Sequence, residues 1–463
     1  MRKRLFDLLS DYAQSGMQPF HMPGHKRRNF DYLIGADLDI TEIPGFDDLH
    51  DPSEILKESQ TFAAAVFGAK QAFYLINGST CGILAALYTV CNKGDPVLMA
   101  RNCHLSVYNG VELLSLEPTY IYPVFDMQHG IYTSVTPQSV EAALQNCPDA
   151  AALVLTSPTY DGVTSDLPAI CRLAHAHDVR VIVDAAHGAH FGFDAYFPQA
   201  AVASGADIVI TSLHKTLPSL TGTALALLND PGLGQSFMHS LSIFETSSPS
   251  YPMLASIDGC VHLIQEHGSV LFSKWADNLR AFRNDAKQLV HIQVLEENEI
   301  SGAFGYDPGK LLLFCAGMPG RELYAQLRAR GIEPEMYGAN YVLAMTSPAD
   351  DAESFSALLQ VLFDIDKRCN TKMRKSDSLY LPAGEKARGV YAAMRSAYTC
   401  VGIAAARGKI SAEYIYAYPP GIPAVVPGER ITDAVLLYIT AAEQCGIKFR
   451  HSISIINEIA VTE

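Results

Sequence analysis

Short apolar runs alternate with segments of helical periodicity through the centre of the chain. Most of these runs are apolar on both faces, which is typical of parallel strands covered by helices. They predict strands at residues 72–77, 96–100, 151–156, 179–184, 206–211 and 223–228. Between them, residues 80–91 and 167–178 carry apolar side chains at helical spacing. Strand alternating with helix indicates one large α/β domain with a mostly parallel sheet, which we place at residues 46–275.

The chain before the first strand has a different pattern, and we interpret residues 1–45 as an N-terminal arm. It begins with a short amphipathic helix, after which prolines and glycine in PFHMPGHKR prevent regular structure. A further helix is expected from residue 52 or 53 to residue 67. Ser53 or Asp51 is its expected cap, because short polar side chains accept hydrogen bonds from the first turn.

The pattern weakens after about residue 275. KLLLFCAG (310–317) and YVLAMTS (341–347) indicate strands, and RELYAQLRARG between them (321–331) indicates a helix. We therefore predict a smaller C-terminal α+β domain at residues 276–463.

Composition and charge exclude several classes of protein. Apolar residues make up 49% of the 463 residues and charged residues 18%, so the chain can bury a core and is not globally disordered. The 34 Lys and Arg against 49 Asp and Glu give a formal charge of −15. Because this field repels phosphate, we expect no general binding of nucleic acid or anionic membrane. Any bound phosphate must be held locally by backbone N–H groups and hydroxyls.

The ten cysteines form no C-x-x-C pair, and several lie in apolar runs where a thiol behaves as a small hydrophobe. A disulfide framework or a zinc site is therefore not expected. The basic N-terminus is not followed by the apolar stretch of a signal peptide, and no run of about 18 apolar residues predicts a membrane span. We expect a cytoplasmic protein.

Residues that could bind a ligand or take part in catalysis lie at the ends of four of the expected strands. The residues are Gly78, Ser79 and Thr80 after the first strand, His104 after the second, Asp184 at the end of the fourth, and Ser212, His214 and Lys215 after the fifth. The carboxyl ends of parallel strands meet at one edge of a sheet, where open α/β folds bind ligands. An anion site at a helix start, a flat ring, a carboxylate and an amine are thus expected to lie together.

Each feature also has a simpler interpretation. Lys215 suits a cofactor-bearing amine whose pKa is lowered in a dry pocket, but most lysines are solvated surface charges. Asp184 could hold a pyridinium nitrogen protonated or cap a helix. Ser79 could be an ordinary cap, and His104 a structural histidine. His187 and His190 with Asp184 could suggest a metal site, but Gly188 and the absent cysteine pairs argue against it.

The chain resembles the pyridoxal-phosphate-dependent ornithine/lysine/arginine decarboxylases of bacterial type, which have the aspartate-aminotransferase fold (fold type I). The segments that carry the resemblance run in the family's order from residue 20 to 430: FHMPGHK, TEIPGFDDLHDP, NGSTCG, RNCHLS, SPTYDGV, DAAHGAH, SLHKTL, ETSSPSY and YPPGIPAVVPGE. Many relatives have Lys and Glu where this chain has Leu105 and Ala185. The chain also begins almost directly at the FHMPGHK arm, so no extra N-terminal domain is expected.

The resemblance implies pyridoxal 5'-phosphate as cofactor and gives roles to particular residues. It implies that Lys215 binds the cofactor covalently, that Asp184 pairs with the pyridine nitrogen, and that Ala186 and His104 cover the two ring faces. The other residues of the expected cofactor site are Gly78, Ser79, Thr80, His187, Ser212 and His214. It further implies that Thr246 and Ser247 reach the neighbouring subunit's phosphate, so that active sites are shared in a homodimer or higher oligomer.

The function that the resemblance implies is decarboxylation of a basic L-amino acid (arginine, lysine or ornithine) to carbon dioxide and an amine of the polyamine pathway. The acidic chain would concentrate such a cationic substrate. Asp47, Asp48 and Glu429 are hypothetical partners of the substrate's distal cation, or else solvated loop charges. Alternatives are an aminotransferase, a lyase, a decarboxylase of a non-basic amino acid, or a non-catalytic binding protein. No short motif selects among the three basic substrates, which differ by little binding energy.

Overall fold

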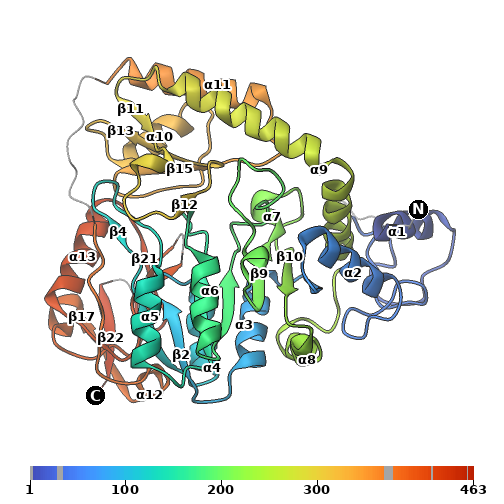
Figure 1. The fold of residues 1–463 in the computed structure, drawn as a ribbon, viewed down its shortest axis with the longest axis horizontal. Helices are drawn as coiled ribbons and strands as arrows, with labels where there is room; N and C mark the ends of the chain where they lie inside the picture. The colour runs from blue at the N-terminus through green and yellow to red at the C-terminus, as the bar shows by residue number, and fades with distance from the viewer. Residues whose placement is uncertain (1–3, 29–34, 370–378, 419–420, 456, 463) are drawn as a thin grey trace.

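The computed structural model describes residues 4–28, 35–369, 379–418, 421–455 and 457–462 (Figure 1). Its helices are α1 (Leu5–Gln14), α2 (Ile55–Phe67), α3 (Gly78–Val90), α4 (Leu105–Leu113), α5 (Pro137–Asn146), α6 (Leu167–Ala176), α7 (Leu213–Thr216), α8 (Gly234–Phe244), α9 (Tyr251–Ala286), α10 (Gly320–Arg328), α11 (Ala352–Asp366), α12 (Val390–Met394) and α13 (Asp433–Gln444). Its strands are β1 (Gln71–Leu75), β2 (Pro96–Ala100), β3 (Glu117–Ile121), β4 (Phe125–Asp126), β5 (Ile131–Tyr132), β6 (Ala152–Thr156), β7 (Val163–Thr164), β8 (Arg180–Asp184), β9 (Ile208–Ser212), β10 (Ala224–Leu228), β11 (Ile292–Val294), β12 (Gly305–Tyr306), β13 (Lys310–Cys315), β14 (Met336–Tyr337), β15 (Tyr341–Met345), β16 (Glu385–Lys386), β17 (Tyr398–Gly402), β18 (Ile415–Ala417), β19 (Ile422–Val425), β20 (Glu429–Arg430), β21 (Phe449–His451) and β22 (Glu458–Thr462).

A seven-stranded sheet forms the centre of the molecule, in the order β1-β10-β9-β8-β6-β2-β3. The pairs from β9 to β3 are parallel, as the runs apolar on both faces predicted. The helix α3 packs on β1, β8, β9 and β10 and on the neighbouring helices α4 and α8. The six strands expected from the sequence are all present, as are the helices expected at 80–91 and 167–178, so the α/β prediction is confirmed.

The strand β10 runs antiparallel to both of its neighbours. The chain between β9 and β10 is residues 213–223, and it holds only the single turn α7. A parallel crossover needs a dozen or more residues, usually with a helix, so a connection this short favours an antiparallel return. The reversal brings the start of β10 to the edge at which β1, β8 and β9 end.

A second, smaller sheet of four antiparallel strands has the order β11-β13-β15-β14 and lies with α10 and α11 at the top of Figure 1. The 36-residue helix α9 connects it to the rest, because α9 packs on α1 and α2 and also on α11. The expected boundary between residues 275 and 276 falls inside α9. The three-part division of the chain therefore stays a prediction.

The cap expected for α2 is wrong. The helix begins at Ile55, and neither Ser53 nor Asp51 bonds its first turn. Instead the Asp47 carboxylate accepts the N–H groups of Ser53, Glu54 and Leu56 at 3.0, 2.8 and 3.0 Å. The start of α2 is thus capped by a carboxylate from an upstream loop and not, as the sequence pattern predicted, by a residue directly before the helix.

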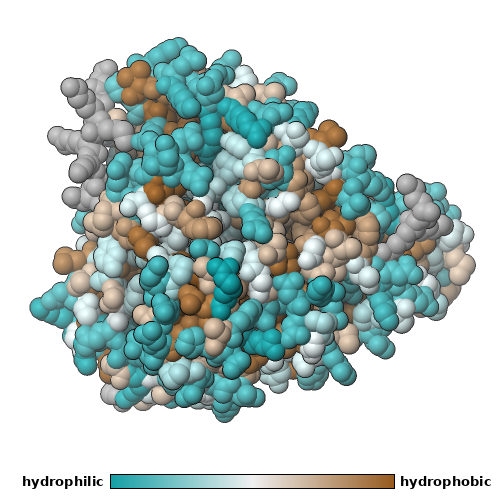
Figure 2. Space-filling view, viewed as in Figure 1, coloured by the Kyte–Doolittle hydropathy of each residue, from teal (hydrophilic) through white to brown (hydrophobic). Residues whose placement is uncertain are grey.

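The surface is mostly hydrophilic on the face shown in Figure 2, with smaller hydrophobic areas between the polar side chains. The N-terminal arm carries three of the exposed large apolar side chains, because Met17, Phe20 and Met22 are 62%, 96% and 66% exposed. In the part of the chain that the structure describes, no helix is both long and apolar enough to cross a membrane.

Candidate active site

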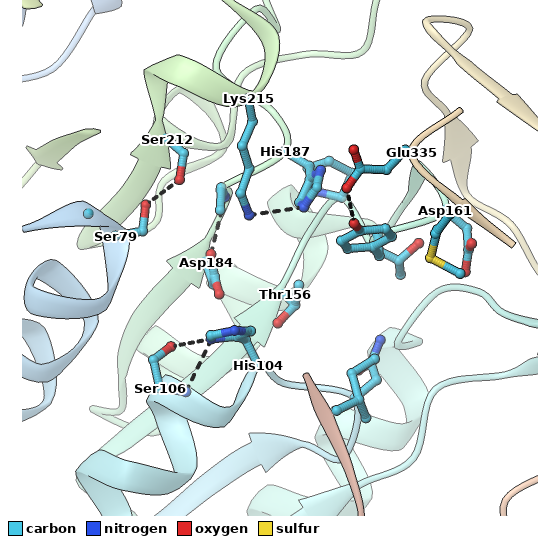
Figure 3. A pocket seen from close by; sticks show the side chains of 18 of the residues that line it. Ser79, His104, Ser106, Thr156, Asp161, Asp184, His187, Ser212, Lys215 and Glu335 are labelled. Atoms are coloured by element: carbon cyan, nitrogen blue, oxygen red, sulfur yellow. Dashed lines mark hydrogen bonds between the residues drawn. The ribbon is translucent and has the colours of Figure 1, made fainter. Parts of the chain in front are cut away.

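A cavity of about 530 Å³ opens at the edge where β1, β2, β6, β8 and β9 end (Figure 3). Ten of the twelve residues expected to bind the cofactor line it. They are Gly78, Ser79, Thr80, His104, Asp184, Ala186, His187, Ser212, His214 and Lys215. Segments more than a hundred residues apart in the sequence thus meet in one pocket, as the strand-end pattern predicted.

One end of the pocket has the character of an anion site. Gly78 begins α3 with a positive φ of 73°, which glycine adopts without strain, and Ser79 lies inside the first turn. The Ser79 hydroxyl bonds the Ser212 hydroxyl at 2.6 Å. The Gly78 N–H donates to the Gly222 carbonyl at 2.9 Å, but the Asn77 side chain forms no capping bond to this turn, which leaves the N–H groups of Ser79 and Thr80 for a ligand from outside the helix.

The middle of the pocket holds a carboxylate and a flat ring. Asp184, at the end of β8, is 5% exposed, and its Oδ1 accepts the Ala186 N–H at 3.1 Å. His104 precedes α4, and its Nδ1 accepts the Ser106 N–H at 3.2 Å. Burial lowers the pKa of His104, with Asp184 opposing and Lys215 adding to this effect. The uncharged form of the ring is therefore favoured, and the ring lines the pocket.

The amine of Lys215 contacts a histidine in the pocket wall. Its Nζ lies 3.0 Å from His187 Nε2, and Figure 3 marks this contact with a dashed line. Burial lowers the pKa of Lys215, against the opposing effect of Asp184 and Glu335. A lowered pKa favours the neutral amine, which is the form of a lysine that acts as a nucleophile.

The sequence interpretation missed Lys310, which stands behind His187. Lys310 begins β13, is 1% exposed, and places its Nζ 2.8 Å from His187 Nδ1. A signal was present in the sequence, because KLLLFC is a strand in which every residue except the first is apolar. A lysine in such a run is rarely buried unless it is paired.

The sequence interpretation also missed a cluster of polar side chains on the side of the pocket away from Ser79. There the Tyr160 hydroxyl donates to Glu335, and the Tyr341 hydroxyl donates to Asp161 at 2.7 Å. Figure 3 shows Asp161 and Glu335 beyond His187. SPTYDGV, which follows the strand expected at 151–156, was a signal for two of these residues.

Two expected cofactor residues, Thr246 and Ser247, lie outside the pocket. They are exposed in the loop between α8 and α9. The Thr246 N–H donates to Asn77 Oδ1 at 3.2 Å, which holds the loop close to the start of α3. Their expected role toward a neighbouring subunit stays a prediction.

The three carboxylates expected at the substrate's distal cation, Asp47, Asp48 and Glu429, are not among the residues that line the chain's own cavity, and their role toward a substrate stays a prediction. The Asp47 carboxylate accepts hydrogen bonds from several backbone N–H groups. Partial burial acts to raise the pKa of Asp47, but these hydrogen bonds have the larger combined effect and lower the pKa. Asp48 accepts the His50 N–H at 2.8 Å. Glu429 is 4% exposed, pairs with the buried Arg101 at 3.3 Å and accepts the Val426 N–H at 2.9 Å.

Family models match most of the chain. The model described as Orn/Lys/Arg decarboxylase, major domain, matches residues 3–307, and that of the C-terminal domain matches residues 369–450. The chain belongs to the Orn/Lys/Arg decarboxylase family. This confirms the resemblance carried by the nine sequence segments and the prediction that the protein is an amino-acid decarboxylase of this class.

Relatives in this family align over almost their whole length. The chain is 32% identical to an arginine decarboxylase of Bacillus subtilis, covering 94% of this chain and 92% of the relative. It is 31% identical to an arginine decarboxylase of Bacillus anthracis, covering 96% and 93%. It is 34% identical to an uncharacterized Bacillus subtilis protein, YaaO, covering 93% and 92%.

Solved structures confirm the fold of the Orn/Lys/Arg decarboxylase family for this chain. The lysine decarboxylase LdcF of Francisella novicida superimposes with a TM-score of 0.85 at 18% identity, covering 99% of this chain and 81% of that one. The constitutive lysine decarboxylase of E. coli gives 0.83 at 19% identity, with the same coverage. An alanine–glyoxylate aminotransferase from Nostoc sp. gives 0.57 at 14% identity, covering 71% and 89%. The fold type I prediction is thus confirmed.

Proposed function

We propose that this protein uses pyridoxal 5'-phosphate to remove the α-carboxylate of a basic L-amino acid: arginine, lysine or ornithine. The observation that carries the proposal is the meeting of Lys215, Asp184, His104 and the start of α3 in one cavity. Amine, carboxylate, flat ring and anion site are the four features that the cofactor requires of a protein.

The residues of the cavity fit this cofactor. Its volume lies within the usual range for small-molecule sites. Among the described lining residues, the Oδ1 of Asn102 is buried without a hydrogen-bond partner. Buried polar atoms are usually satisfied, so this orphaned oxygen supports a polar ligand in the cavity. The open N–H groups of α3 and the Ser79–Ser212 hydroxyl pair suit a phosphate.

Each residue of the site then has a defined task. The first turn of α3 and its hydroxyls would hold the phosphate, and His104 and Ala186 would contact the ring. Asp184 would keep the ring nitrogen protonated, and Lys215 would supply the amine that attaches the cofactor. The bound cofactor supplies an electron sink for the bond to the carboxylate. The protein's contribution is to orient that bond and exclude water.

The relatives and the charges of the pocket support a basic substrate. Two of the relatives above are named arginine decarboxylases. Besides Asp184, the described lining residues include the carboxylates Asp161 and Glu335, which lie on the side away from the anion site. Burial raises the pKa of Asp161, and a cation beside these carboxylates would favour their charged forms, so they suit a substrate with a cationic far end, as does the net charge of −15.

A side-by-side turnover assay with arginine, lysine and ornithine tests this function. We expect carbon dioxide and the matching amine by mass spectrometry, with one substrate preferred by roughly 10-fold or more in kcat/KM, since one methylene in a pocket is worth about 1–3 kcal/mol. A keto acid product would instead identify an aminotransferase. Cofactor absorbance without any product would identify a non-catalytic binding protein.

We also propose that two chains complete each active site. The loop of Thr246 and Ser247 is exposed next to the start of α3, and the arm exposes Met17, Phe20 and Met22. Such apolar side chains are typical of an interface rather than of a solvated arm. Both features are therefore available to a second copy of the chain.

Subunit exchange between two inactive variants tests the shared site. Lys215→Ala is mixed with the double variant Thr246→Ala, Ser247→Ala, and turnover is followed. A hybrid dimer has one intact site and one site with both defects. Since random mixing makes about half the dimers hybrid, activity should recover to at most roughly a quarter of wild type. No recovery after verified exchange would show that each chain builds its own site.

A further inference from the structure

A buried lysine outside the pocket contacts the pocket through one histidine. The ring of His187 lies between two amines, with Lys215 Nζ 3.0 Å from Nε2 and Lys310 Nζ 2.8 Å from Nδ1. His187 is 6% exposed and Lys310 is 1% exposed, so bulk water does not mediate between them. Lys310 is tightly enclosed, since a Cβ on Gly162 would lie 2.7 Å from its Cγ.

The chemistry of the ring allows these two contacts in only certain proton arrangements. Burial lowers the pKa of His187, and the charges of Lys310 and Lys215 lower it further, so the imidazole is neutral. A neutral imidazole has one N–H donor and one acceptor nitrogen. An ammonium group can only donate. One lysine must therefore be neutral when the other is charged, and the tautomer of His187 records which one it is.

The carboxylates around Lys215, His187 and Lys310 act on both lysine amines. Asp307, Asp161 and Glu335 favour the charged form of Lys310, whereas Asp184 and Glu335 favour that of Lys215. The charges of His104 and His214 would lower the pKa of His187 further, and Arg283 donates to the Lys310 carbonyl rather than to its amine. Burial lowers the pKa of Lys310 to about 8, against the opposing effect of Asp307. The amine can thus exchange a proton near neutral pH.

We propose that Lys310 is a positioning residue that takes the proton of Lys215 through His187 and so holds Lys215 in its nucleophilic form. The Lys215 ammonium donates a proton to His187 Nε2, and the Nδ1 proton moves to the neutral amine of Lys310. The products are a neutral Lys215 amine, the Nε2–H tautomer and a charged Lys310. One proton enters the ring and one leaves it, so charge moves between the lysines while the ring stays neutral.

This inference rests on the proposed function, because it assigns a partner to the amine that attaches the cofactor. The test follows the attachment itself and not turnover. Cofactor-free protein is mixed with pyridoxal 5'-phosphate, and the rate at which the visible absorbance band appears is measured over about pH 6–9. In Lys310→Met, which keeps the volume but not the charge, the midpoint of this profile should rise. At a pH below both midpoints, each unit of rise slows attachment about tenfold.

The controls separate a proton effect from damage to the fold. Lys93→Met makes the same change at an exposed lysine and should leave the midpoint unchanged. His187→Phe keeps an aromatic ring but removes both nitrogens, so it should shift the midpoint in the same direction with Lys310 intact. If Lys310→Met does not fold, His187→Phe decides. The double variant should shift the midpoint no further than a single one, because both changes break one path.

Two outcomes overturn the proposal. Lys310→Met that folds, binds the cofactor and keeps the wild-type midpoint would show that Lys310 is only a packing residue. An unshifted midpoint in His187→Phe would show that the ring carries no proton. If the wild-type protein gains no band and forms no amine, the proposed function fails. If it gains the band and turns over while the variants match it, only the role of Lys310 fails.

Discussion

Replacing Lys215 with alanine is expected to abolish both the visible cofactor band and turnover. Lys215 contributes the only amine that the described residues place directly in the lining of the pocket, and alanine offers no nucleophile for attachment. Loss of a residue that acts at the reacting centre lowers kcat by roughly 10³–10⁶-fold. Absorbance spectra and an amine-release assay on purified protein measure both effects.

The Lys215→Ala protein should fold normally, because the change removes a charge that borders a cavity and no core volume. Lys70→Ala, the same replacement at an exposed lysine, is the matched control and should keep band and activity. A Lys215→Ala protein that retains the band would mean that another amine attaches the cofactor, and the central assignment would be wrong.

Replacing Asp184 with asparagine is expected to leave cofactor attachment intact but to reduce kcat by about 10²–10⁴-fold, the range usual for loss of a positioned proton-holding group. An amide cannot hold a proton on the ring nitrogen, so the electron sink weakens. The fold should survive, because the asparagine oxygen can still accept the Ala186 N–H that Asp184 Oδ1 accepts at 3.1 Å.

A neighbouring carboxylate gives the control for this prediction. Asp178 is exposed and has a positive φ of 59°, a conformation that asparagine tolerates well. Asp178→Asn should therefore match wild type in both stability and turnover. Full activity in Asp184→Asn would show that Asp184 only terminates β8 and anchors the following turn.

The sequence predicted the central sheet well because its strands are apolar on both faces. The segments 96–100, 151–156 and 179–184 became β2, β6 and β8 within one residue of the expected bounds. The reversed direction of β10 was not foreseen, since an apolar run carries no information about direction. The length of the chain between β9 and β10 was the available signal.

The candidate site was predictable where it depends on strand ends and not where it depends on tertiary contacts. Four strand-end motifs meet in the pocket because the sheet places them at one edge. Asp47 and Glu429 were expected near a substrate, yet their carboxylates are occupied by backbone N–H groups and by Arg101. Lys310 was overlooked because its partner His187 lies 123 residues away. The Arg101–Glu429 and Lys310–His187 contacts each join residues far apart in the chain, so neither leaves a local pattern in the sequence.

The buried contact of Arg101 with Glu429 has a consequence for how this protein can be divided. Arg101 belongs to the region matched by the major-domain model and Glu429 to that matched by the C-terminal model. The second region also borders the pocket, because the Leu105 N–H donates to the Gly421 carbonyl at 3.0 Å beside His104. Separating the regions would leave a buried guanidinium without its counter-charge, at a cost of about 3–5 kcal/mol. The two regions therefore cannot be separated without loss of stability. A gene fragment that encodes the first region alone would produce a protein whose pocket lacks part of its wall.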